Sequence, residues 1–272
     1  MKAVVCFKAI PDYSRLSQED WVWDERHTVD TGFVRRIFNC FDESALEMAL
    51  KLSLNQETPS ENELCALTID DQKSDLFLKH LIAVGYNGVR IQADEKIDLR
   101  FNPLAVSHLI AGFIKKTGQQ LALLGQQGGE GDNRQTGMFV AERLGWPLIS
   151  GVSELAWSEP KNSLTVTSKI EGNTLVQTVK LPIVLNIGQS IESPYLRIPS
   201  LKQKLAAKKQ KIRVLTPQDL GLDLSYGFKI DKTLVHLRSP KQNASCVFLE
   251  NNNLQETAYT LYNDHIKERL SK

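Results

Sequence analysis

Residues 121–144 read LALLGQQGGEGDNRQTGMFVAERL and contain the unit that decides the fold. The apolar run Leu121–Leu124 predicts a buried strand, and a glycine-rich loop follows it directly. The pattern from about Gln135 to Leu144 then predicts a helix. A strand, a short loop and a helix in this order form half of a βαβ unit, which favours a parallel sheet.

The same alternation of short apolar runs and helical patterns continues on both sides of this unit. The elements expected there are a strand at 3–7, a helix at 42–54, strands at 64–68 and 89–92, helices at 74–84 and 103–117, and a fifth strand after Pro147. Because crossovers between parallel strands are right-handed, this order predicts an α/β fold with a doubly wound, mostly parallel sheet.

Beyond residue 151 the pattern changes. Leu164–Ile170 and Leu175–Leu181 predict a β-hairpin, and Pro182–Ile187 predicts one more buried strand. We expect residues 8–38 to be irregular, residues 190–213 to form an exposed arm, and a last helix at about 255–270. The predicted organisation is an α/β domain at 1–189 that includes the hairpin at 152–187, an arm at 190–222, and a C-terminal extension at 223–272.

Composition argues for a soluble globular chain. Hydrophobic residues make up 42% and charged residues 24% of the 272 positions, and the formal net charge is +1, so a polyanion-binding protein is a poor first hypothesis. No apolar run reaches the length of a membrane helix, and the apolar run at the N-terminus is too short for a signal peptide. The four cysteines lack C-x-x-C spacing and are interpreted as free thiols. These features predict a cytoplasmic protein.

The loop at 125–137 is the most informative candidate for a ligand site. Its glycines would let the backbone approach a ligand, and the helix that follows would present free N–H groups to an anion. In a doubly wound sheet, ligands bind beyond the carboxyl ends of the strands where the strand order reverses. The loops after the first strand (Phe7–Pro11) and after Leu124 are therefore expected to flank a crevice. The loop is neither G-x-G-x-x-G nor a P-loop, so a glycine-rich turn that binds nothing stays open as an alternative.

This loop resembles the signature of a known family. Leu123-Leu124-Gly125-Gln126-Gln127 followed by Asp132-Asn133-Arg134-Gln135-Thr136-Gly137 resembles the L-L-G-K-Q and D-D-D-x-N-Q-T-G runs of electron-transfer flavoprotein β subunits. Further collinear matches are Val5-Cys6-Phe7-Lys8 with Pro11-Asp12-Tyr13, Asn39-Cys40-Phe41-Asp42-Glu43 with Ala45, Gly145-Trp146-Pro147, Pro194–Ser200, and Leu215-Thr216-Pro217 with Asp219-Leu220-Gly221. The resemblance covers residues 1–222, whereas 223–272 match poorly.

The resemblance implies a fold like that of the adenine-nucleotide α-hydrolases and an electron-carrier subunit with no catalytic residue and no metal of its own. It implies AMP, or in electron-bifurcating members a second FAD, in a β-subunit site, while a redox-active FAD is held mainly by the α subunit of a heterodimer. By the same resemblance, the cofactor-binding positions are Cys6, Asn39, Cys40, Phe41, Asp42, Ile69, Gly125, Gln126, Gln127, Gly128, Gly129, Glu130, Gly131, Asp132, Asn133, Arg134, Gln135 and Thr136.

The arm also has an implied role, which is contact with a partner dehydrogenase through Tyr195, Ile198 and Pro199. Packing of Ile198 on its own domain or on the α subunit is the alternative. No nucleic-acid partner and no membrane span are expected.

Departures from the family pattern suggest a divergent bacterial β-like branch. Gln126 stands where the family has lysine, Glu130 and Gly131 replace two aspartates, and Arg134 replaces an asparagine. Arg134 adds a cation, so the choice between AMP and FAD stays open. A stand-alone adenine-nucleotide sensor of the universal-stress-protein type is the alternative function. An adenylate-dependent ligase or hydrolase is disfavoured because the sequence offers no convincing nucleophile and base pair.

Overall fold

The computed structural model describes residues 1–25, 28–55, 63–70, 72–92, 99, 101–129, 133–160, 162–190, 192–222, 246–249 and 253–270. The chain divides into two compact units, Met1–Ile230 and Asp231–Lys272.

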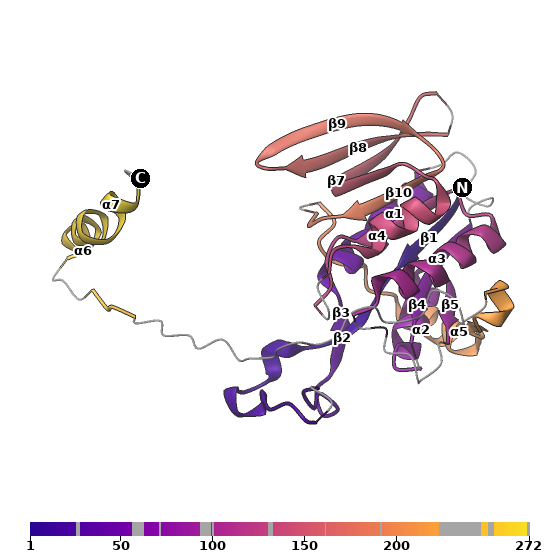
Figure 1. The fold of residues 1–272 in the computed structure, drawn as a ribbon, viewed down its shortest axis with the longest axis horizontal. Coiled ribbons are helices and arrows are strands. Elements are labelled where there is room, and N and C mark those ends of the chain that lie inside the picture. Colours follow the sequence, from indigo (N-terminus) through magenta and orange to yellow (C-terminus); the bar gives the residue numbers. More distant parts are fainter. Residues whose placement is uncertain are drawn as a thin grey trace. The chain divides into compact units, whose positions relative to one another are not determined.

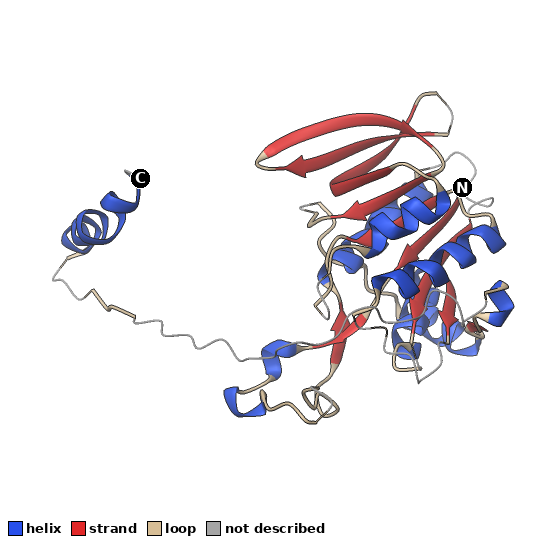
Figure 2. Ribbon diagram, viewed as in Figure 1, coloured by secondary structure: helices blue, strands red, loops and turns tan. Residues whose placement is uncertain are grey.

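The larger unit is built on a nine-stranded sheet with the order β11-β5-β4-β1-β6-β10-β7-β8-β9. The strands of this sheet are β1 Lys2–Cys6, β4 Glu63–Ile69, β5 Asn87–Ile91, β6 Leu121–Gly125, β7 Leu148–Ser158, β8 Ser163–Ile170, β9 Asn173–Lys180, β10 Ile183–Ile187 and β11 Arg213–Leu215. Every pair from β11 to β7 is parallel, and β7, β8 and β9 pair antiparallel, as the long upper strands in Figure 2 show. The predicted doubly wound, mostly parallel sheet with a hairpin extension is confirmed.

Helices cover both faces of the parallel part of the sheet (Figure 1). The helices on one face are α1 Cys40–Leu54 and α2 Asp75–Val84, and those on the other are α3 Pro103–Thr117 and α4 Thr136–Leu144. Strand β1 shows how two cores arise, because Ala3 and Val5 join the cluster under α1 while Val4 and Cys6 join the cluster under α3. Alternate residues of a strand point to opposite faces, so a strand buried on both faces is apolar throughout.

Residues 8–38 are more ordered than the sequence predicted. They contain the short antiparallel pair β2 Ala9–Pro11 and β3 Arg36–Phe38 and two 3-10 turns, η1 Tyr13–Arg15 and η2 Gln18–Asp20. The guanidinium of Arg36 donates to the Ala9 carbonyl. Three-residue strands leave no detectable periodicity in a sequence, which explains the difference.

The stretch expected as an exposed arm also carries a helix, α5 Leu201–Lys209. Ser200 and Gln203 form a reciprocal capping box at its start. Ala207 is buried and packs with Ile82 and Ala83 of α2, so the second half of the arm is attached to the domain. A 3-10 turn, η4 Gln218–Leu220, follows β11.

The smaller unit holds the predicted C-terminal helix. It consists of α6 Leu254–Thr260, a π-helical segment η5 Leu261–Ile266, and α7 Lys267–Leu270, with no buried residue among them. Across the described parts of both units, no helix is long and apolar enough to cross a membrane.

Candidate functional site

The position predicted for a ligand crevice is the edge of the sheet at the carboxyl ends of β1 and β6, and we refer to this edge as the crevice. From β1 the sheet continues to β4 and β5 on one side and to β6 and β10 on the other. Strands β1 and β6 are parallel neighbours with Cys6 beside Leu124, so the loops that follow them meet at the same edge. This is the topological switch point at which open α/β sheets bind ligands.

Two polar residues at the start of α1 clamp these loops together. The buried carboxylate of Asp42 accepts the backbone N–H of Lys8 at 2.9 Å and that of Gly125 at 3.1 Å. The Nδ2 of Asn39 donates to the Gln127 carbonyl at 2.8 Å, and this side chain makes no capping bond to α1. The first turn of α1 therefore fixes the distance between the loops after β1 and β6.

The glycines of the loop allow an approach that no side chain would permit. A Cβ at Gly125 would overlap the Asp42 carboxylate and lie 3.0 Å from the Cβ of Phe41. A Cβ at Gly129 would lie 2.5 Å from the Cδ1 of Ile10. The loop backbone is thus held against α1 at one end and against β2 at the other.

Helix α4 begins at the far end of the same loop. The Oδ1 of Asn133 accepts the Gln135 N–H at 2.9 Å, and Arg134 adopts a left-handed conformation with φ 55°. Gly137 lets the first turn of α4 lie directly on Asn186 of β10, where a Cβ would overlap its Oδ1. The first N–H groups of α4 have no helical acceptor and carry the positive end of the helix dipole, which suits an anion.

Burial sets the protonation of Asp42 and Cys6. It raises the pKa of Asp42 to about 6, against the opposing effect of the Lys8 and Gly125 N–H groups. Burial, and secondarily the Asp42 carboxylate, raise the pKa of the Cys6 thiol far above neutrality. The Cys6 thiol is therefore neutral, so this side chain can line the crevice but cannot act as a nucleophile.

The structure brings most of the predicted positions to this edge of the sheet. Cys6 ends β1, Ile69 ends the neighbouring β4, and the segments 39–42, 125–129 and 133–136 surround the switch point. Glu130, Gly131 and Asp132 lie outside the described residues. The assignment of these positions to a nucleotide remains a prediction.

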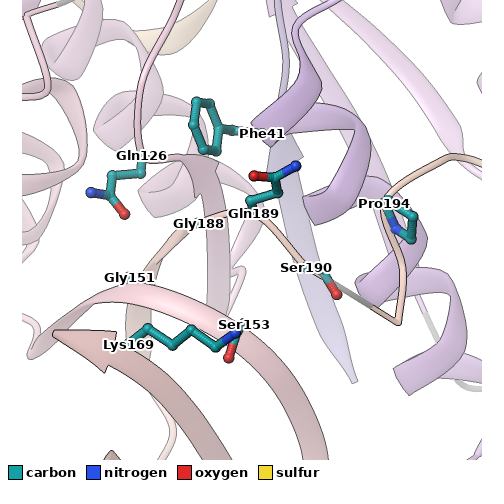
Figure 3. Close-up of a pocket in the computed structure, with 9 residues that line it drawn as sticks. All are labelled: Phe41, Gln126, Gly151, Ser153, Lys169, Gly188, Gln189, Ser190 and Pro194. Carbon is teal, nitrogen blue, oxygen red and sulfur yellow. The ribbon is translucent and has the colours of Figure 1, made fainter. Parts of the chain in front are cut away.

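A second hollow, which the sequence did not reveal, adjoins the crevice. This pocket of about 570 Å³ shares Phe41 and Gln126 with the crevice and extends to Lys169 of β8 (Figure 3). Its other lining residues are Gly151, Ser153, Lys169, Gly188, Gln189, Ser190 and Pro194. The one sequence signal available was Gly188, a glycine directly after a buried strand.

Two further acids of α1 fasten the arm. The buried Glu47 accepts the backbone N–H of Arg197 at 3.1 Å and its guanidinium Nη2 at 2.6 Å, and Glu43 accepts the Leu196 N–H at 3.2 Å. The pairing with Glu47 raises the pKa of Arg197.

Buried and exposed side chains follow one another closely in the arm, where Leu196 is buried. Tyr195 is 76% and Ile198 83% exposed, whereas Pro199 is buried. The Ile198 side chain therefore does not pack on its own domain. Its contact with a partner stays a prediction.

Comparison with known proteins gives the family. The model described as the electron transfer flavoprotein domain matches residues 28–220, which is most of the chain. The chain belongs to the electron transfer flavoprotein family. The mitochondrial electron transfer flavoprotein subunit beta of Arabidopsis thaliana is 28% identical over 92% of this chain and 93% of its own length. The human subunit beta is also 28% identical, with the same two coverages.

A bacterial relative covers even more of the chain. The Escherichia coli protein YgcR, named among electron transfer flavoprotein subunits, is 26% identical over 99% of both chains. The predicted membership in the β-subunit family of electron transfer flavoproteins is therefore confirmed. The family match includes α1, β6, α4, β10, the hairpin and nearly all of the arm, and therefore the pocket and the α1 and β6 side of the crevice, whereas β1 lies before it.

Proposed function

We propose that this chain is the β subunit of a heterodimeric electron-transfer flavoprotein. In this proposal it holds AMP in the crevice at the β1–β6 switch point and covers an FAD held mainly by an α subunit. The observation that carries the proposal is the family match, which includes Asn39, Asp42 and the loop after β6 that these two side chains bind. Electrons would pass through the flavin, from a dehydrogenase to an acceptor.

The crevice residues fit an adenine nucleotide. The glycines at 125 and 129 leave backbone exposed to a ligand, and the N-terminus of α4 supplies N–H donors for a phosphate. Cys6 and Ile69 at the ends of β1 and β4 offer neutral, apolar surface for a purine ring. AMP would supply a fixed phosphate charge that orders the loop, and no proton transfer is required of the protein.

The pocket beside the crevice fits the flavin of a partner. Its lining offers the aromatic face of Phe41, the amides of Gln126 and Gln189, and the backbone of two glycines (Figure 3). FAD would supply the redox chemistry when bound. The residues of this chain would orient its ring and exclude water from it, because the protein's share of cofactor chemistry is position and electrostatics.

The arm fits the docking of a dehydrogenase. Ile198 is 83% exposed although Leu196 and Pro199 on either side of it are buried, and Leu201 and Leu205 of α5 add exposed apolar surface at 73% and 58% exposure. A few apolar anchors of this kind dominate the energy of many interfaces. The surrounding basic residues of α5 are Lys202, Lys204, Lys208 and Lys209.

Co-expression with an electron-transfer flavoprotein α subunit from the same source tests the proposal. We expect a yellow complex that elutes as a one-to-one heterodimer, with one flavin absorbance equivalent per complex. A colourless chain that stays alone, or pairs only with itself, would contradict it and favour a stand-alone nucleotide sensor.

A further inference from the structure

The pocket beside the crevice carries one charged side chain, Lys169 of β8, among its nine lining residues. We propose that the Lys169 ammonium makes this pocket a binding site for a negatively charged group, and that this cation lies beside the flavin of the partner subunit. It would thereby favour the reduced, anionic flavin and raise the reduction potential. The inference rests on the proposed function and goes beyond it by naming the residue that tunes the cofactor.

The floor of the pocket is bare backbone from three strands. Gly151 of β7 is left-handed with φ 71°, and a Cβ there would lie 2.6 Å from the Lys169 carbonyl oxygen. A Cβ at Gly188, just beyond β10, would lie 3.5 Å from the Cα of Gly151 and from the Oε1 of Gln126. The two glycines therefore bring β7, β8 and the end of β10 together without side chains that would fill the space.

The Lys169 ammonium is available to a ligand. The side chain runs along the pocket toward Ser153, and it makes no hydrogen bond or ion pair with any residue that the structure describes (Figure 3). Ser153 is itself buried and donates to the Thr167 carbonyl at 3.4 Å. A cation without a partner, above a backbone floor, produces a positive potential in the pocket.

The other polar groups of the pocket support an anion. Ser190 is buried, and its Oγ accepts the Ser193 N–H at 3.0 Å, so its hydroxyl hydrogen is left to donate. Gln126 and Gln189 add two side-chain amides, and no carboxylate lines the pocket. Asp42, which follows the lining residue Phe41, directs its oxygens to the Lys8 and Gly125 N–H groups.

A flat ring that gains negative charge fits this lining better than a phosphate. Phe41 forms an aromatic wall, and side-chain amides match the donors and acceptors at the pyrimidine edge of a flavin. Lys169 is exposed in this chain, so exclusion of water would require the α subunit to cover the pocket. The charge added to the flavin on reduction would then interact with Lys169 more strongly than in bulk water. A carboxylate of the α subunit is the competing occupant.

The test uses the co-purified heterodimer and three variants. Lys169→Gln removes the charge, and Lys169→Arg keeps it. Lys180→Gln makes the same charge change on exposed Lys180 of β9, at the opposite end of the hairpin strands. Spectroscopic redox titration gives the flavin reduction potential of each complex, and FAD content and elution volume are measured on the same samples.

We expect Lys169→Gln to shift the potential to more negative values with full FAD content, and Lys169→Arg and Lys180→Gln to match the wild type. An unchanged potential in Lys169→Gln with full FAD would overturn the inference and leave the proposed function standing. Weaker association at an unchanged potential would also overturn it, in favour of an ion pair with the α subunit. A wild-type chain that forms no flavin-containing heterodimer would overturn the proposed function itself.

Discussion

The crevice and the arm are both fastened to helix α1, but by different chemistry. At the first turn of α1, the Asp42 carboxylate accepts two backbone N–H groups, which are neutral donors. Further along α1, Glu47 accepts both the backbone N–H and the guanidinium of Arg197. The close contacts of the crevice therefore depend on glycines at 125 and 129. The arm instead depends on a charged pair, and its Ile198 side chain is exposed to solvent. One helix thus orients a buried binding site and an exposed docking segment.

The largest effect is expected from filling the crevice. In Gly125→Ala the new methyl group would occupy the position of the Asp42 carboxylate, so the clamp must open. We expect a loss of about 3 kcal/mol in the free energy of unfolding, together with loss of bound nucleotide. Urea unfolding and nucleotide content measure the two effects. Gly118→Ala is the control, because its site is open and only its φ of 66° costs about 1 kcal/mol. Equal losses in the two variants would show that the close approach at Gly125 is unimportant.

A smaller effect is expected from Asp42→Asn. The amide retains one acceptor oxygen but turns an NH₂ donor toward a backbone N–H of Lys8 or Gly125, which costs about 1–3 kcal/mol.

The pH dependence of this variant sharpens the prediction. The folded pKa of Asp42, about 6, lies above its ordinary value of 3.8, so between these values the folded protein binds more protons than the unfolded chain. The contribution of Asp42 to stability therefore rises as pH falls from 7 toward 4, by about 3 kcal/mol in total. Urea unfolding at several pH values should show the wild type gaining on Asp42→Asn toward acid pH. A constant difference would contradict the raised pKa.

The smallest effect on stability is expected at the arm. Because Ile198 is 83% exposed, Ile198→Ala should change the free energy of unfolding by less than about 0.5 kcal/mol. It should nevertheless slow electron transfer from the dehydrogenase and leave the flavin spectrum unchanged. Its buried neighbour gives the matched control, since Leu196→Ala should cost about 2–4 kcal/mol. An unaltered transfer rate in Ile198→Ala would reject the docking role.

Local signals account for what could be predicted from the sequence. The strand at 121–124 and its glycine loop follow from an apolar run and from residues that favour turns. The helix end at Gly118 follows from a left-handed glycine, and the crevice follows from strand order. These features need only neighbouring residues, or the general rule for doubly wound sheets.

Features built from distant segments could not be predicted in this way. The Glu47 and Arg197 pair joins residues 150 positions apart, and the pocket joins Phe41 to Lys169. Neither residue of such a pair carries a local pattern that indicates the other. Asn39 shows the same limit, because its position before α1 is that of a helix cap, yet its side chain bonds to the loop after β6 instead.

Mass spectrometry of the small molecules released from the denatured heterodimer shows whether this chain holds a nucleotide of its own. We expect one AMP for each copy of this chain, in addition to one FAD for each heterodimer. The Asn39→Ala variant, which lacks the bond to the Gln127 carbonyl, should release less AMP and the same amount of FAD. A second FAD in place of AMP would correct the identity of the ligand. A heterodimer that releases only one FAD and no second nucleotide would show that the crevice of this chain holds no ligand.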